Sequence, residues 1–243
     1  MRRLAWLPLL AVLLLAWEAW VRLRGIPDYL LPAPSAIAQA LWHDRSPLAS
    51  QAMVTLREML LGLLAAVLLG LGAAVVLQRL AWLRSAVYPL LIASQSVPVI
   101  TISPLLLIYL GFGLRPHIAI VALYCFFPIT ANALDGFREA PPDLGRTMRT
   151  LHASPRAIFW RVELPWALPR IFTGVRIAAA YAAVGAAFSE LAGGSGGLVD
   201  SMRDQLDTPL VGAAITLLAA MSLALVRVVV LLERLAVPWS REE

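Results

Sequence analysis

The sequence contains no lysine, and all 20 of its basic residues are arginine. A P-loop, a Schiff-base enzyme and a lysine nucleophile each need a lysine, so all three are excluded. If ATP drives this protein, ATP and its magnesium ion must bind to another chain. Cys125 is the only cysteine and lies in an apolar run, which excludes a disulfide and a cysteine-based metal site. We therefore expect no metal and no other cofactor on this chain.

Charged residues are scarce, at 14% of the chain, whereas hydrophobic residues make up 60%. This composition lies far outside the range of soluble globular proteins and predicts an all-α protein that crosses a membrane several times. The net charge of +5 is compatible with a nucleic-acid partner. Arginines beside apolar spans are better explained by the excess of positive charge in cytoplasmic loops, so no nucleic acid is expected.

Six apolar segments are long enough to cross about 30 Å of hydrocarbon, which takes about 20 helical residues. The predicted spans are 4–21, 59–77, 85–110, 118–134, 171–192 and 209–232. Arg2 and Arg3 precede the first span as they would precede a secretory signal, but no small-residue cleavage site follows. We interpret this span as an uncleaved anchor and expect 1–243 to form one transmembrane domain.

The arginines also predict the orientation of the spans. With the N-terminus in the cytoplasm, twelve arginines fall in inner segments and six in outer ones, namely Arg22, Arg24, Arg45, Arg57, Arg115 and Arg203. Arg176 and Arg227 lie inside spans. Both termini and the largest loop, 135–170, are therefore expected on the cytoplasmic side.

The first part of this loop has the pattern of a short amphipathic helix. Leu144, Met148 and Leu151 share one helical face, and Arg146 and Arg149 point the other way. Such a helix can dock on a partner protein or rest on acidic lipid, and the composition alone does not decide between them.

The second part of the loop predicts another short helix. Ser154 followed by Pro155 is typical of an N-cap with proline at the first helical position, and Pro165 is expected to end the helix. Two short helices that meet at a tight turn would form a compact knob with a basic rim.

These residues also carry a family resemblance. VELP (162–165), LP (168–169) and TGVRIA (173–178) resemble the cytoplasmic EAA loop of permease subunits from binding-protein-dependent bacterial ABC importers. The resemblance extends over nearly the whole chain, through LLPAPSAIAQAL (30–41), SQSVPVITISPLLLIYLGFG (94–113) and LLERLAVPW (231–239). These stretches are most similar to the sulfonate, taurine and nitrate permease group.

The resemblance implies a type I importer permease with six transmembrane helices and a coupling loop that docks on an ATPase. Aligned on its Leu-Pro step, the family's Glu-Ala-Ala falls on Arg146, Thr147 and Met148, and its Gly falls on His152. The implied coupling residues are Arg146, Thr147, Met148, Leu151, His152, Ala153, Ser154, Val162, Leu164 and Pro165.

Two of these positions depart from the family pattern. Arg146 reverses the charge of the family's Glu, which implies a matching change on the ATPase. His152 replaces a Gly that would supply a left-handed turn residue. Histidine is among the residues enriched at positive φ, so the turn is expected to be kept.

The resemblance also implies the partners. The chain would work as a homodimer in a bacterial inner membrane, in contact with lipid, with two cytoplasmic ABC ATPase subunits and a periplasmic or lipid-anchored binding protein. It would catalyse no bond chemistry itself.

Polar residues and prolines in the third span suggest a translocation path, because broken helices in lipid are tolerated where they line a cavity. The candidate path residues are Gln95, Ser96, Pro98, Thr101, Phe127, Asn132, Tyr181 and Glu190. Small and polar residues can equally serve only to pack helices together. Glu190, near an outer helix end, is expected to face an aqueous vestibule or solvent, or to contact the binding protein.

Within the family, YCFFPITANALDGFR (124–138) and AYAAVGAAFSE (180–190) are most similar to permeases for thiamine pyrimidine precursors. The spans supply aromatic side chains and few cations, which favours a flat, neutral or weakly basic heterocycle over a sulfonate or nitrate. The sulfonate, taurine or nitrate importer stays as the alternative.

Two other classes of protein need weighing. GGSGG (193–197) matches the Gly-x-Ser-x-Gly pattern and raises an intramembrane serine protease with Ser195 as nucleophile, which would need His43 or His117 as a base. A secondary transporter is disfavoured because the spans contain few carboxylates that could couple to ions.

Overall fold

The computed structural model describes residues 6–94, 98–193, 195–200 and 207–241, and every regular element among them is a helix. Their bounds are α1 Trp6–Arg24, α2 Pro34–His43, α3 Arg45–Arg79, α4 Ala81–Ser94, α5 Val99–Leu110, α6 Leu114–Glu139, α7 Pro142–Thr150, α8 Pro155–Ile158, η2 Phe159–Glu163, α9 Leu164–Gly193, α11 Thr208–Ala236 and η3 Pro238–Arg241.

Within the described residues, four helices are long and apolar enough to cross a membrane: Arg45–Arg79, Leu114–Glu139, Pro155–Gly193 and Thr208–Ala236. α1 adds a fifth apolar helix of 19 residues. The remaining predicted span, 85–110, is not one helix, because α4 ends at Ser94 and α5 begins at Val99. Pro98 is the N-cap of α5, where a residue without a backbone N–H is tolerated.

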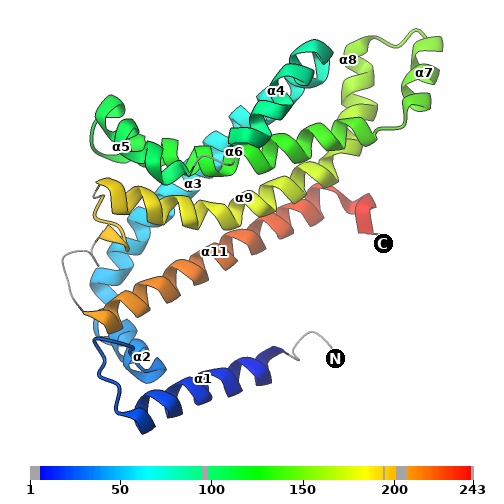
Figure 1. The fold of residues 1–243 in the computed structure, drawn as a ribbon. Helices are drawn as coiled ribbons and strands as arrows, with labels where there is room; N and C mark the ends of the chain where they lie inside the picture. Colours follow the sequence, from blue (N-terminus) through cyan, green and yellow to red (C-terminus); the bar gives the residue numbers. More distant parts are fainter. Residues whose placement is uncertain (1–5, 95–97, 194, 201–206, 242–243) are drawn as a thin grey trace.

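α6 and α9 form the centre of the bundle, with α3 packed on both of them and α11 beside α9 (Figure 1). The buried face of α9 consists mainly of small residues, including Ala178, Ala179, Ala182 and Ala186. Small residues let helix backbones approach closely, which is how helices associate in lipid. Cys125 of α6 is fully buried, and its thiol donates a hydrogen bond to the carbonyl of Ala178 at 3.2 Å.

The closest approach of α6 and α9 predicts a large effect for one methyl group. A Cβ at Gly174 would lie 2.7 Å from the Pro128 carbonyl oxygen and 2.9 Å from the Asn132 Cβ, so the backbones would have to separate. We expect Gly174→Ala to lower the free energy of unfolding by about 1–3 kcal/mol. Denaturation of the purified chain in detergent measures this change.

Gly72→Ala is the matched control, because a Cβ at Gly72 of α3 meets nothing within 4 Å. Alanine is the better helix former there, so this variant should be more stable than the wild type by about 0.5–1 kcal/mol. Equal effects of the two substitutions would contradict the tight α6–α9 crossing.

The two ends of the bundle differ. α7, α8, η3 and the first turn of α1 lie toward the right of Figure 1, and α2, segment 195–200 and the start of α11 lie toward the left. The predicted coupling loop is therefore at the end of the bundle opposite to segment 195–200.

Candidate functional site

α7 presents an uncovered apolar row at the end of the bundle. Leu144 is exposed, Met148 is half-buried and Leu151 is 72% exposed, and no residue of α7 is buried. Arg146, on the other side of the helix, is exposed and pairs with Asp143 of the same helix at 3.2 Å. The amphipathic helix predicted here is present, and its apolar face is free to meet a partner.

The turn after α7 is left-handed at His152. The φ of His152 is 59°, and it is the only positive value at a non-glycine residue in the described part of the chain. The His152 N–H bonds to the Arg149 carbonyl and the Ala153 N–H to the Met148 carbonyl, both at 2.9 Å. Histidine thus occupies the left-handed position expected from the family's Gly.

This turn predicts a graded response to substitution at His152. A β-branched residue is poorly tolerated at positive φ, and we expect His152→Val to destabilise the turn by about 1–2 kcal/mol. His152→Gly should keep it. Limited trypsin cleavage at Arg149 and Arg156 reports the opening of the loop, and equal cleavage rates in both variants would contradict the left-handed turn.

The second helix begins as predicted, because the Ser154 hydroxyl oxygen accepts a hydrogen bond from the Ala157 N–H at 3.2 Å and Pro155 is in the first turn. The predicted end at Pro165 is wrong. The helix continues from Pro155 to Gly193 over 39 residues. A π-turn, Phe159–Glu163, precedes the proline, and the Leu164 N–H bonds to the Phe159 carbonyl five residues earlier. Such a wider turn allows the helix to continue past a residue without an N–H.

Ionic and aromatic contacts tie the base of the loop to the bundle. Arg79 of α3 lies 3.6 Å from Glu163 and stacks over the ring of Phe159 at 5.1 Å. Arg170 of α9 pairs with Glu139 of α6 at 2.6 Å. The loop is thus connected to α3 and α6 as well as to its own helix.

The ten predicted coupling residues separate into two groups. Arg146, Thr147, Leu151, His152 and Ser154 are exposed near the tip, and Met148 and Ala153 are half-buried beside them. The others lie in the helix that leaves the loop, where Val162 is buried and Leu164 and Pro165 are half-buried. The first group can contact a partner, and the second holds the loop in place.

A second feature is a pocket of about 450 Å³ between α5, α6 and α9. Its lining contains no charged residue and consists of Pro98, Val99, Ile102, Leu123, Tyr124, Phe126, Phe127, Pro128, Tyr181 and Val184. The volume is within the range of small-molecule pockets, and the two tyrosines add hydroxyl groups to an aromatic wall.

Three of the predicted path residues, Pro98, Phe127 and Tyr181, line this pocket. Thr101 donates its hydroxyl hydrogen to the Pro98 carbonyl, and the Asn132 amide donates to the Pro128 carbonyl, so each bonds within its own helical segment. Gln95 and Ser96 lie outside the described residues.

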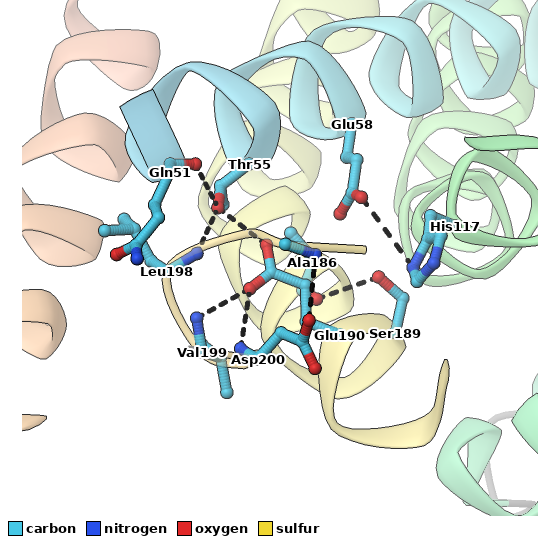
Figure 2. A network of polar contacts seen from close by, with 11 residues as sticks. Gln51, Thr55, Glu58, His117, Ala186, Ser189, Glu190, Leu198, Val199 and Asp200 are labelled. Carbon is cyan, nitrogen blue, oxygen red and sulfur yellow. Dashed lines mark hydrogen bonds and ion pairs between the residues drawn. The ribbon is translucent and has the colours of Figure 1, made fainter. Parts of the chain in front are cut away.

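Glu190 is not at a solvated helix end or in an open vestibule, because its side chain is fully buried. Its carboxylate accepts hydrogen bonds from the Thr55 hydroxyl at 2.6 Å and from the Val199 and Asp200 N–H groups at 2.6 and 3.4 Å (Figure 2). Segment 195–200 folds over this carboxylate, where a Cβ at Gly197 would come within 2.2 Å of it. Gly197, the last glycine of the GGSGG stretch, is thus needed for this close packing.

The described contacts give Ser195 no catalytic base. Its hydroxyl is buried and has no hydrogen-bond partner among the described residues. The ring of His117 instead faces Glu58, with Nδ1 3.8 Å from Oε1. A nucleophilic serine needs a base in hydrogen-bond reach, so the protease hypothesis has no support here.

The structure is a helical bundle with an exposed loop at one end, and a continuous helix joins this loop to an uncharged pocket, an arrangement that suits a transport subunit. The comparisons with known proteins agree. The chain belongs to the family of inner membrane components of binding-protein-dependent transport systems, whose profile matches residues 66–241. It is a multi-pass inner membrane permease of an ABC importer, in which ATP is hydrolysed by a separate chain.

Its relatives carry several substrate names. The chain is 35% identical to the riboflavin transport permease RibX of Chloroflexus aurantiacus over 95% of this chain and 88% of that protein. It is 32% identical to the formylaminopyrimidine transport permease ThiX of Halalkalibacterium halodurans over 96% and 94%. The taurine transport permease TauC of Escherichia coli is 29% identical over 96% and 88%.

The solved structure of the MetNI methionine ABC transporter in an inward-facing conformation has the same fold. It matches with a TM-score of 0.69 and 19% identity, over 78% of this chain and 95% of that one. The fold is therefore that of a type I importer permease.

Proposed function

We propose that this permease imports a flat, neutral heterocycle of the aminopyrimidine type. The observation that carries the proposal is the uncharged aromatic pocket around Tyr124, Phe127 and Tyr181. Aromatic faces stack on a flat ring, and tyrosine hydroxyls can bond its amino or ring nitrogen atoms. A sulfonate or nitrate would favour a cation in the wall, and none of the lining residues is charged.

The relatives support the same ligand chemistry. Two of the three relatives described above are named as permeases for nitrogen heterocycles, namely riboflavin and formylaminopyrimidine. The taurine relative supports the alternative, an importer of sulfonates. The charge of the pocket lining is the observation that favours the heterocycle.

In the proposed assembly, two copies of the chain form the membrane path and α7 of each copy docks on one of two ATPase subunits in the cytoplasm. A periplasmic or lipid-anchored binding protein delivers the substrate at the opposite end. This arrangement places both termini in the cytoplasm, in line with the excess of arginine in the segments on that side.

Uptake by proteoliposomes that contain this chain, its ATPase and its binding protein tests the proposal. Labelled hydroxymethylpyrimidine should enter in a saturable, ATP-dependent manner, and taurine and nitrate should not. Tyr181→Ala should reduce the uptake by about tenfold, the equivalent of a lost aromatic contact of about 1.5 kcal/mol. Tyr109→Ala is the control, since Tyr109 is 82% exposed and is not among the pocket residues.

Uptake of taurine or nitrate without the pyrimidine would overturn the heterocycle and leave the permease in place. Equal loss in the two tyrosine variants would mean that the pocket is not on the path.

A further inference from the structure

The outer halves of α3, α6 and α9 enclose a pair of titratable side chains that the importer mechanism does not use. Glu58 of α3 and His117 of α6 are both fully buried, and His117 Nδ1 lies 3.8 Å from Glu58 Oε1 (Figure 2). This pair was not predicted from the sequence, because the second span was expected to begin at residue 59, whereas α3 begins at Arg45.

The hydrogen-bonding capacity of the pair is unmet. Both carboxylate oxygens of Glu58 and both ring nitrogens of His117 are buried without a hydrogen-bond partner among the described residues, as is the Ser195 hydroxyl. The neighbouring Glu190 differs, because one hydroxyl and two backbone N–H groups donate to it. Three donors thus compensate Glu190, whereas an anion at Glu58 would have only the Ser195 hydroxyl and the His117 ring beside it, because the Ser189 hydroxyl donates to the Ala186 carbonyl.

Among the described residues, no other positive charge faces the pair. α9 contributes Glu190 and the Ser189 hydroxyl, and the segment after it contributes Asp200 and Ser195. The arginines next to the pair in sequence, Arg57 and Arg115, are exposed. Two buried carboxylates beside Asp200 repel each other, so binding of one positive charge at the pair is strongly favoured.

A proton fits this site better than a metal ion. The described residues include no group of three or more histidine, cysteine, aspartate or glutamate side chains that could hold a metal. One proton shared by Glu58 and His117 gives zero net charge, either as carboxylic acid and imidazole or as carboxylate and imidazolium. Either form also allows a hydrogen bond across the pair, with a small closure of the 3.8 Å separation.

The site is coupled to segment 195–200 through one turn of α3. Thr55, three residues before Glu58, donates to Glu190 and accepts a hydrogen bond from the Leu198 N–H at 3.0 Å. A shift of α3 at Glu58 would therefore also displace Thr55 from its contacts with Glu190 and Leu198. Gly197 lies so close to the Glu190 carboxylate that an added Cβ would overlap it. Segment 195–200 therefore has little room to slide along with α3.

We propose that Glu58 and His117 form a proton-binding site that holds segment 195–200 closed over α3 while the proton is bound. When the proton leaves at alkaline pH, Glu58 becomes a buried anion near Glu190, α3 moves away from it, and the segment opens. The outer end of the permease is in this way sensitive to the pH of the outer medium, whatever substrate is transported.

Hydrogen exchange of the full chain in lipid nanodiscs tests the coupling. We compare the protection of the amides of 198–200 at pH 6 and pH 9 after correction for intrinsic exchange rates. In the wild type, protection should fall by about tenfold at pH 9, because local opening becomes easier. In Glu58→Gln, which carries no charge at either pH, it should be the same at both. Glu139→Gln, at an exposed ion pair, should behave as the wild type.

A second measurement observes the site without changing it. The chain has three histidines, so His43→Gln combined with His152→Asn leaves His117 as the only one. Its ¹⁵N resonances should change between pH 6 and pH 9, and the change should disappear when Glu58→Gln is added. Invariant resonances, an equal loss of protection in Glu58→Gln, or protection restored at pH 9 by Na⁺, K⁺ or Zn²⁺ would each overturn the proton site.

Discussion

Leu151→Asp is expected to abolish substrate-stimulated ATP hydrolysis by the complete transporter while the permease stays folded. Leu151, the C-cap residue of α7, is 72% exposed beside the left-handed turn and continues the apolar row of Leu144 and Met148. A buried interface that meets a new carboxylate must desolvate it without a partner, which costs several kcal/mol. Docking on the ATPase should therefore fail, and the helix itself should tolerate the exposed charge.

Leu151→Met is the matched control, because it keeps the volume and the apolar character of the side chain. ATP hydrolysis is measured in nanodiscs with and without the loaded binding protein. If the aspartate variant is stimulated as strongly as the methionine variant, the tip of the loop is not the docking surface. An elution volume on size exclusion equal to that of the wild-type permease shows that the variant is folded.

Thr55→Val is expected to lower the free energy of unfolding by about 2–4 kcal/mol although it changes no volume. The Thr55 hydroxyl is fully buried, donates to Glu190 at 2.6 Å and accepts from the Leu198 N–H at 3.0 Å. Valine would remove one donor from the Glu190 carboxylate and would remove the hydroxyl oxygen that accepts from the Leu198 N–H. Unfolding of the purified chain in detergent measures the loss.

Thr216→Val on α11 provides the comparison. Thr216 is exposed and its hydroxyl bonds only to the Gly212 carbonyl of its own helix, so the change should be within about 0.5 kcal/mol. A loss of similar size at both positions would mean that the contact between Thr55 and Glu190 does not hold α3, α9 and segment 195–200 together.

Features that depend on local sequence could be predicted. The hydrophobic face of α7, the Ser154 cap and the left-handed His152 each follow from residues within a few positions of one another. Apolar length likewise predicted long helices where α3, α6, α9 and α11 lie, but it did not predict the break between α4 and α5 within 85–110.

Features that depend on distant residues could not. Thr55 and Glu190 are 135 residues apart in sequence, and Thr55 and Leu198 are 143 apart, so no local pattern brings them together. Glu58 looked like a residue outside the span, since a charge next to Arg57 usually marks a helix end. The sequence does indicate that the helix begins before residue 59, because α3 contains no glycine or proline between Pro47 and Gly62 that would stop it.

The end of the second loop helix was mispredicted for a different reason. Proline usually ends a helix, but the π-turn Phe159–Glu163 allows the chain to pass Pro165 without a break. The consequence for function is large, because Pro155–Gly193 becomes one helix that runs from the loop to Tyr181 in the pocket.

We expect this helix to carry the movement of the ATPase to the pocket. Thiol labelling of Tyr181→Cys in a Cys125→Ala background tests it, because Tyr181 lies both on the helix and in the pocket wall. The labelling rate in the reconstituted transporter is compared with ATP bound and without nucleotide. The rate should differ by about tenfold between the two states, the scale of a typical allosteric coupling, and adding Leu151→Asp should remove the difference. Equal rates in the two states of the otherwise active transporter, or a difference that survives Leu151→Asp, would contradict the account.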